Sequence, residues 1–307
     1  MKLNSKSKIL SISHCDLDGV GCQIALGNFF SNIEYHAATF TSINHIVKTL
    51  STKFKNYDCV IITDIYPKDL SILDSYDNVV VLDHHETNKS HDPDKNRFVI
   101  TDFCAAQLTK NWVEAMFNVD LSFLDDFMDL VNDYDLWIHK DPKSKQMNML
   151  YGYYRHNKTL KRFFNGDVNF SPRENQYLKE RQKEFENIWD QLNVYDLEKI
   201  NGCFFTYEDF PNELCEKLYS KGKEGGYDVV FAYNINNNNI SVRTGRTDIN
   251  LGEVLEDLEV GGGHPCSASC RGISSLSDVP LLMEMVEKEM YKRWPQVRRK
   301  WLKSKYS

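Results

Sequence analysis

The chain has 307 residues, of which 41% are hydrophobic and 26% are charged, and its formal net charge is -7. This composition is typical of a globular protein with enough apolar residues for one large domain or two ordinary ones. The acidic balance argues against a surface built to grip long duplex DNA, although it leaves room for a local basic channel. No apolar run approaches the ~20 residues of a membrane span, so we expect no membrane partner.

The sequence contains eight cysteines and no Cys-x-x-Cys pair. The first residues, Met1 to Lys8, lack the apolar segment of a secretory signal peptide. Disulfide frameworks belong mainly to small secreted proteins. We therefore expect free thiols and a cytoplasmic location.

Short apolar runs alternate with helical patterns in the first half of the chain. The expected strands cover residues 9–13, 33–38, 59–63 and 79–82, and the expected helices cover residues 20–30, 43–50 and 70–75. Strands that alternate with helices form parallel β-α-β units. We therefore predict a doubly wound parallel α/β sheet whose functional groups gather beyond the carboxyl ends of its strands.

The second half begins with helical patterns and then returns to α/β alternation. A helical pattern over 105–135 is followed by a mixed, aromatic-rich region over 140–175 and a charged helix over 173–197. The later strands are expected at 203–207, 228–234 and 240–243, with helices at 212–219, 251–258 and 279–294. We predict a catalytic domain over 1–170, a helical linker over 171–198, and a smaller α/β domain over 199–307, across a cleft, that ends in a basic helix.

Polar side chains follow three of the predicted strands. Asp83-His84-His85 comes directly after the apolar run at 79–82, and Asp64 follows the run at 59–63. Buried polar groups are costly unless they have partners, so the triplet indicates either a metal or phosphate site or a structural hydrogen-bond cluster. After the first strand, His14, Asp16 and Asp18 alternate along an extended segment, which places them on one side.

Each of these groups has a plainer interpretation when it is taken alone. Asp18 or Asp64 by itself would be assigned as a helix N-cap, and the pair Asp133 and Asp135 as solvated surface. Because the strand ends share one edge of a parallel sheet, the joint pattern favours a metal site. Mixed Asp and His ligands suit Mn²⁺, Fe²⁺ or Zn²⁺ better than Mg²⁺. Five or six of them suffice for two ions, which a bridging carboxylate would hold about 3.5–4 Å apart.

The same residues resemble a known family. The motifs His14-x-Asp16-x-Asp18-Gly19, Asp64, Asp83-His84-His85 and Asp135-x-Trp137 are similar, in order and spacing, to the four motifs of the DHH phosphoesterases. Gly261-Gly262-Gly263-His264 resembles the signature of the DHH-associated C-terminal domain. The resemblance covers roughly residues 8–275, and within the family the segment Asp16–Cys22 is most similar to that of the oligoribonucleases, or nanoRNases.

The resemblance implies a role for each metal-capable residue. His14 and Asp16 would hold one ion and Asp64 would bridge, while the second ion would be held by Asp18, His84 and Asp135. Asp133 is the alternative to Asp135. Mn²⁺ is the favoured ion, with Mg²⁺ and Co²⁺ as alternatives, and the two cations would activate the attacking water.

The resemblance also implies residues that contact the histidines or the substrate. Asp83 would fix the orientation of the histidines, and His85 would contact the scissile phosphate or the leaving group. Gly261, Gly262 and Gly263 would permit close backbone approach to the substrate, and His264 would touch phosphate or base. A charge-assisted contact to a phosphate would come from Arg243 or Arg246. After the glycines, Ser267-Ala268-Ser269 stands where the family tends to have Ala-Ala-Gly, which alters the expected substrate clamp.

We therefore expect a two-metal phosphodiesterase that releases nucleoside monophosphates from a short oligonucleotide or dinucleotide. Alternatives within this chemistry are hydrolysis of cyclic dinucleotides, of their linear products, or of nucleoside 3′,5′-bisphosphates. An alternative of another class is a catalytically silent nucleotide-binding sensor, and a homodimer is left open. The basic residues between Lys288 and Lys305, interleaved with Trp294, Trp301 and Tyr306, indicate either single-strand binding or a solvated terminal helix.

Overall fold

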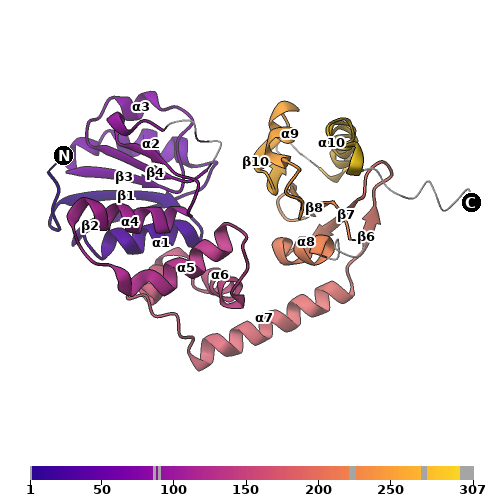
Figure 1. The fold of residues 1–307 in the computed structure, drawn as a ribbon, viewed down its shortest axis with the longest axis horizontal. Coiled ribbons are helices and arrows are strands. Elements are labelled where there is room, and N and C mark those ends of the chain that lie inside the picture. Colours follow the sequence, from indigo (N-terminus) through magenta and orange to yellow (C-terminus); the bar gives the residue numbers. More distant parts are fainter. Residues whose placement is uncertain (1, 86–87, 89–90, 221–225, 271–274, 298–307) are drawn as a thin grey trace, which may run out of the picture. The chain divides into compact units, whose positions relative to one another are not determined.

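The computed structural model describes residues 2–297 except 86, 87, 89, 90, 221–225 and 271–274. The chain divides into two compact units, Met1–Glu180 and Arg181–Ser307. In each of them a β-sheet carries helices on its faces (Figure 1). None of the helices in the described part of the chain is long and apolar enough to cross a membrane.

The first unit contains a sheet in which every pair of neighbouring strands is parallel. Its strands are β1 (Lys8–His14), β2 (Asn32–Ala38), β3 (Cys59–Thr63), β4 (Val79–Asp83) and β5 (Arg97–Val99), in the order β2-β1-β3-β4-β5. The predicted parallel sheet is therefore confirmed. Because all strands run the same way, β1, β3 and β4 end at one edge, where the predicted site residues follow them.

Helices cover both faces of this sheet. They are α1 (Leu17–Gly27), α2 (Ile43–Ser51), α3 (Ser71–Asp74), α4 (Ala105–Phe117), α5 (Asp125–Asp135) and α6 (Pro142–Phe163). Successive strand residues point to opposite faces. Ile9 and Ile61 accordingly pack with α1, α4, α5 and α6, whereas Leu10 and Ile62 pack with α2 and α3. All four are fully buried, and each such side chain contributes about 1.5–3 kcal/mol of hydrophobic stabilisation.

The second unit is built on a mixed sheet. Its strands are β6 (Val194–Asp196), β7 (Gly202–Tyr207), β8 (Val229–Asn234), β9 (Asn239–Arg243), β10 (Gly261–His264) and β11 (Ser267–Cys270), in the order β10-β11-β9-β8-β7-β6. The pair β7 and β8 is parallel, and the other pairs are antiparallel. Helix α8 (Pro211–Ser220) packs on one face, and α9 (Leu251–Asp257) and α10 (Val279–Arg293) on the other. Helix α7 (Pro172–Asp190) crosses the boundary between the units.

Three segments differ from the sequence-based expectation. Residues 142–163 form α6 where a mixed region was expected, and Asp141 caps its start by accepting a hydrogen bond from the Lys143 N–H. The charged helix ends at Asp190, because the chain then pairs β6 with β7. Gly261–His264, expected as a glycine-rich segment after a helix, is an edge strand that pairs with β11.

Candidate metal centre

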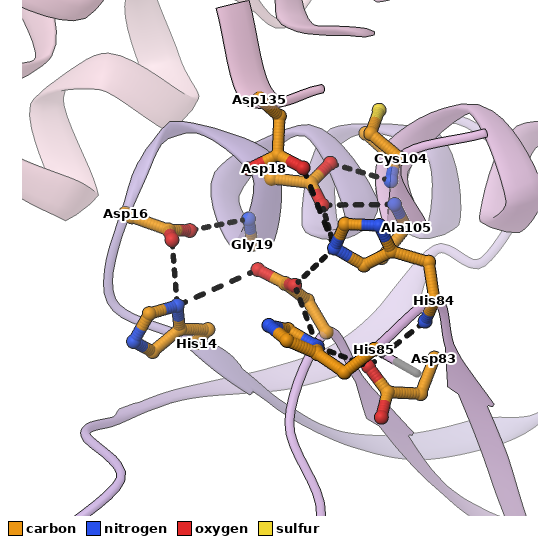
Figure 2. A network of polar contacts seen from close by, with 12 residues as sticks. His14, Asp16, Asp18, Gly19, Asp83, His84, His85, Cys104, Ala105 and Asp135 are labelled. Carbon is orange, nitrogen blue, oxygen red and sulfur yellow. Dashed lines mark hydrogen bonds and ion pairs between the residues drawn. The ribbon is translucent and has the colours of Figure 1, made fainter. Parts of the chain in front are cut away.

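Three parallel strands deliver the polar side chains to one edge of the first sheet. His14 is the last residue of β1, Asp64 follows β3, and Asp83 is the last residue of β4. Asp64 has a φ of 59°, the left-handed region that few residues other than glycine adopt. This conformation turns the chain sharply at the end of β3, while the Asp64 N–H still donates to the Leu82 carbonyl at 3.0 Å. Figure 2 shows the imidazoles and carboxylates converging on a common centre.

The loop between β1 and α1 is fixed by hydrogen bonds to its carboxylates. Asp16 is the N-cap of α1 and accepts from the Gly19 N–H at 2.9 Å. Asp18 accepts from the first two N–H groups of α4, Ala105 at 2.8 Å and Ala106 at 2.7 Å. Asp18 therefore lies at the N-terminus of a different helix, where the macrodipole stabilises negative charge. The simple N-cap interpretation of Asp18 is wrong, and the cap belongs to Asp16.

Gly19 permits this loop because no side chain fits at its position. A Cβ at Gly19 would lie 2.0 Å from the His14 carbonyl oxygen. Such a contact cannot form without a shift of the backbone that carries His14 and Asp16. The glycine is therefore part of what positions these ligands.

Ligand-capable side chains form three overlapping groups. They are His14, Asp16 and Asp64; Asp18, His84 and Asp135; and Asp64, His84 and His85, and the ligand atoms within each group lie within 4.8 Å of one another. In the first, His14 Nδ1 lies 2.6 Å from Asp16 and 3.6 Å from Asp64. In the second, His84 Nε2 lies 3.6 Å from Asp18 and 3.4 Å from Asp135. Asp64 and His84, whose atoms are 3.5 Å apart, each belong to two groups.

Asp64 carries the clearest sign that a cation belongs here. Its side chain is 2% exposed, and Oδ2 is buried without a hydrogen-bond partner in the described part of the chain. Burial and the nearby carboxylates of Asp16 and Asp18 raise the pKa of Asp64 well above its usual range. A buried carboxylate among other carboxylates is stable only with compensating positive charge. The donor set therefore fits divalent cations, and Asp64 is one of the residues that would hold them.

The protonation states of His84 and Asp16 agree with metal ligation. Burial lowers the pKa of His84, which keeps its imidazole neutral, the form that binds metals. Burial would raise the pKa of Asp16, but the neighbouring His14 lowers it below the usual range. Asp16 is thus held as a carboxylate beside His14. His84 and Asp16 therefore present the protonation states that a cation requires.

Asp83 contacts both His84 and His85 through its carboxylate. Its Oδ1 accepts from the His84 N–H at 2.9 Å and lies 2.8 Å from His85 Nδ1. Burial would lower the pKa of His85, but the hydrogen bond with Asp83 raises it overall. The Asn88 side chain donates to Asp83 Oδ2 at 2.6 Å. Sequence reasoning missed Asn88, because a lone Asn five residues after Asp83 gives no spacing signal.

The structure separates Asp135 from Asp133. Asp135, the last residue of α5, points to His84, and burial together with Asp18 raises its pKa. Asp133 instead accepts hydrogen bonds from the Lys140 N–H at 2.8 Å and the Asp141 N–H at 3.2 Å. Asp133 therefore holds the chain between α5 and α6, and Asp135 is the residue that lies with the ligands.

The predicted substrate-binding residues all lie in the second unit. Gly263 has a φ of 146°, and a Cβ there would lie 2.6 Å from the Ser267 carbonyl oxygen, so the pairing of β10 with β11 requires glycine. Arg243 donates to the carbonyls of Val242 and Ala268. Three further predicted residues, Gly261, Gly262 and His264, belong to the same strand β10.

Arg246 and the basic C-terminal residues are largely paired with carboxylates where the structure describes them. Arg246 binds Asp228 at 3.1 Å and Asp248 at 2.6 Å. On α10, Arg293 contacts Asp257 at 2.6 Å. The part of the predicted basic helix from residue 298 onward lies outside the described residues. The cations on α10 therefore fit the solvated-helix interpretation better than the single-strand interpretation.

Comparison with known proteins gives matches in structure but not in sequence. No family model and no curated protein matches the chain. The DHH domain of a member of a family of ribosomal proteins is 13% identical, with a TM-score of 0.61, over 93% of this chain and 87% of that one. The pGpG-specific phosphodiesterase PggH from Vibrio cholerae is 13% identical, with a TM-score of 0.53, over 93% and 99%.

A third solved structure is RecJ from Thermus thermophilus in complex with Mn²⁺. It is 13% identical, with a TM-score of 0.58, and the match covers 93% of this chain and 52% of RecJ. The chain thus spans about half the length of that protein. The matches extend over nearly the whole chain. The ligand-capable residues of the four motifs that resemble those of the DHH phosphoesterases lie together at the edge of the first sheet. The chain has the fold of the DHH-domain proteins, as its motifs predicted.

Proposed function

We propose that the protein is a two-metal phosphodiesterase that hydrolyses short oligonucleotides to nucleoside monophosphates. One observation carries the proposal: the buried carboxylate of Asp64 lies between two groups of His and Asp ligands. Paired sites of this kind suit in-line displacement at phosphorus. The structural neighbours PggH, a phosphodiesterase, and RecJ, solved with Mn²⁺, support the same chemistry.

We assign residues to each ion on the basis of the ligand groups. His14, Asp16 and Asp64 would hold one, and the second would be held by Asp18, His84 and Asp135, with Mn²⁺ as the favoured ion. When bound, such cations lower the pKa of water and neutralise charge on the phosphate. The carboxylate of Asp64 faces both groups, so it would contribute to the binding of both ions.

His85 would act on the substrate, and Asp83 would orient its ring. The carboxylate of Asp83 lies 2.8 Å from His85 Nδ1, which fixes the ring and favours the protonated imidazole. A protonated ring can donate a hydrogen bond from Nε2 to a phosphate oxygen or to the leaving oxygen. Asn88 would stabilise this arrangement through the second oxygen of Asp83.

In the second unit we propose that β10 and its neighbours bind nucleotide. The glycines of β10, an edge strand, carry no side chains of their own that would keep a ligand from the backbone, and His264 ends that strand. Arg243, whose side chain donates to neutral oxygens, is the better candidate for a phosphate contact. Arg246 would first have to leave Asp228 and Asp248.

A second candidate function is hydrolysis of a linear dinucleotide such as pGpG. It is favoured by the match to PggH, which covers 99% of that pGpG-specific enzyme. Both candidates use the same bond and the same site. They differ in the length of substrate that the protein accepts.

A substrate panel tests the proposal. The purified protein is assayed with Mn²⁺, Mg²⁺ or Co²⁺ on RNA of two, three, five and about fifteen nucleotides, on a cyclic dinucleotide, on a nucleoside 3′,5′-bisphosphate and on pyrophosphate. We expect Mn²⁺-dependent release of mononucleotides from the shortest RNAs, abolished in Asp64→Ala and His84→Ala. Turnover of the dinucleotide alone would select the second candidate. Unchanged activity in either variant, or nucleotide binding without turnover in any metal, would refute the proposal.

We include a cytoplasmic location in the proposal. All eight cysteines are free in the structure, and most are buried. Buried free thiols persist in reducing compartments. A homodimer remains a proposal. The absence of long duplex DNA and of membranes among the partners is a proposal that rests on the composition.

A further inference from the structure

Phe40 lies beside two of the site histidines. It follows β2, which ends at Ala38. Its ring centroid is 4.5 Å from that of His14, with an interplanar angle of 49°. On another side it lies 5.7 Å from the ring of His85, edge-to-face at 87°. The phenyl ring thus touches a residue of the first ligand group and the residue expected to face the substrate.

The same ring is left largely open to solvent. Phe40 is 52% exposed, although this unit fully buries the rings of Phe30, Phe54, Phe127 and Phe163. A single exposed phenylalanine is ordinary on a protein surface. What sets Phe40 apart is that an exposed aromatic face is held at the edge of the metal centre by contacts with two of its residues.

We propose that Phe40 is a stacking surface for the nucleobase of a nucleotide next to the scissile phosphate. The inference rests on the proposed function, and it specifies the substrate class as one that carries a base beside the bond to be cut. A substrate phosphate at the centre is covalently tied to a ribose and its base. Phe40, which contacts His14 and His85, offers that base an apolar face beside the centre. Inorganic pyrophosphate and polyphosphate have no such group.

The chemistry of the ring also predicts how selective the contact is. A phenyl group has no donor or acceptor with which to distinguish base edges, whereas every base has a π-face. Stacking on Phe40 therefore discriminates weakly among bases and favours the larger purines. It discriminates strongly between a nucleotide and an analogue that has lost its base.

The experiment compares a dinucleotide with two abasic analogues. In one analogue the base of the first nucleotide is replaced by hydrogen, and in the other the base of the second nucleotide is replaced. The measured quantity is the ratio of kcat/KM for the dinucleotide to kcat/KM for each abasic analogue. Stacking of one base corresponds to a change of roughly five- to 150-fold. We expect Phe40→Ala to lower the ratio for one analogue by about tenfold, mainly through KM, and Phe40→Trp to keep or raise it. Phe123→Ala is the matched control, since Phe123 is 51% exposed on the 3₁₀ turn Ser122–Leu124, and it should leave the ratio unchanged.

Two results would overturn the inference. An equal loss on the dinucleotide and on both analogues would mean that Phe40 only positions His14 and His85. A ratio for Phe40→Leu equal to that of the wild type would mean that an aromatic face is not required. If the wild-type protein hydrolyses no short RNA, the proposed function fails by itself. The inference is then decided by binding: the Kd of a labelled dinucleotide, measured with Ca²⁺ present, must rise in Phe40→Ala and not in Phe123→Ala.

Discussion

Replacing Asp64 by asparagine should stabilise the metal-free protein, although Asp64 is a central residue of the site. Its carboxylate is buried, one oxygen has no hydrogen-bond partner in the described chain, and an oxygen of Asp16 lies within 4.8 Å. At that separation two like charges repel by about 3 kcal/mol with an effective dielectric constant of ~20. Asparagine removes the charge and keeps the shape.

The raised pKa of Asp64 sets the pH dependence of this effect. The pKa of Asp64 is raised in the folded state, so the carboxyl group binds a proton that the unfolded chain, with a pKa of about 3.9, has lost. The resulting penalty is absent below that ordinary pKa and grows as pH rises. Because the asparagine amide stays poorly paired, we expect a net gain of about 1–3 kcal/mol for Asp64→Asn at pH 7.

The assay is urea unfolding in EDTA at pH 4, 5.5 and 7, with Asp133→Asn as the matched control. Asp133 is also buried, but two backbone N–H groups bind it and its pKa is lowered, so its loss should cost about 1–2 kcal/mol. The gain from Asp64→Asn should disappear near pH 4. In saturating Mn²⁺ the wild type should instead be more stable than Asp64→Asn, because Asp64→Asn has lost a ligand of the ion sites. If both variants were destabilised alike in EDTA, the account of Asp64 would be wrong.

Three further predictions concern residues around the site and in the scaffold. Asp83→Asn should weaken Mn²⁺ binding or activity about 10- to 100-fold, because it loosens both histidines, and metal titration checks this. Gly19→Ala should cost about 2 kcal/mol or more in urea unfolding, because the new Cβ meets the His14 carbonyl oxygen at 2.0 Å. Glu174, paired with Arg162 at 2.7 Å, has its pKa lowered to about 2 despite burial, so Glu174→Gln should cost about 3 kcal/mol at pH 7.

These three predictions have their own controls. Gly152→Ala places a Cβ in open space on α6, so it should be neutral or stabilising by up to about 1 kcal/mol, and equal damage from both glycine substitutions would contradict the steric argument. The contribution of Glu174 is present above its ordinary pKa and lost as pH falls toward about 2. The wild type and Glu174→Gln should therefore converge in acid. If Asp83→Asn bound Mn²⁺ with wild-type affinity, Asp83 would have no role in the metal site.

Much of the first unit is predictable because local patterns and tertiary structure agree there. The run Cys59–Ile62 is apolar, and together with Thr63 it forms a strand with the predicted bounds. A parallel strand covered on both faces is typically such a continuous apolar run. The site follows from the same logic, because parallel strands bring their carboxyl ends together. The spacing to Trp137 favours Asp135 over Asp133, but only through the family resemblance, since the two carboxylates are chemically alike. Their roles depend on where α5 ends and on which backbone groups of residues 140 and 141 come near.

The missed elements depend on contacts that a local pattern does not contain. Strand β5 has three residues and exists through its pairing with β4. Strand β10 is made largely of glycines, which have low strand propensity, and its partner β11 determines it. In α6, Arg155 has a non-helical φ of 60°, so the helical period is interrupted within the element. The pattern over 140–175 was mixed for that reason.

The ligands of the metal centre are dispersed from residue 14 to residue 135, with at least one contributed by each of β1, α1 and α5 and by the ends of β3 and β4. Long loops must close before such a centre exists, and closure of this kind comes late in folding. A cation therefore cannot guide the early steps. A cation bound afterwards would slow the unfolding of the first unit while leaving its folding rate almost unchanged.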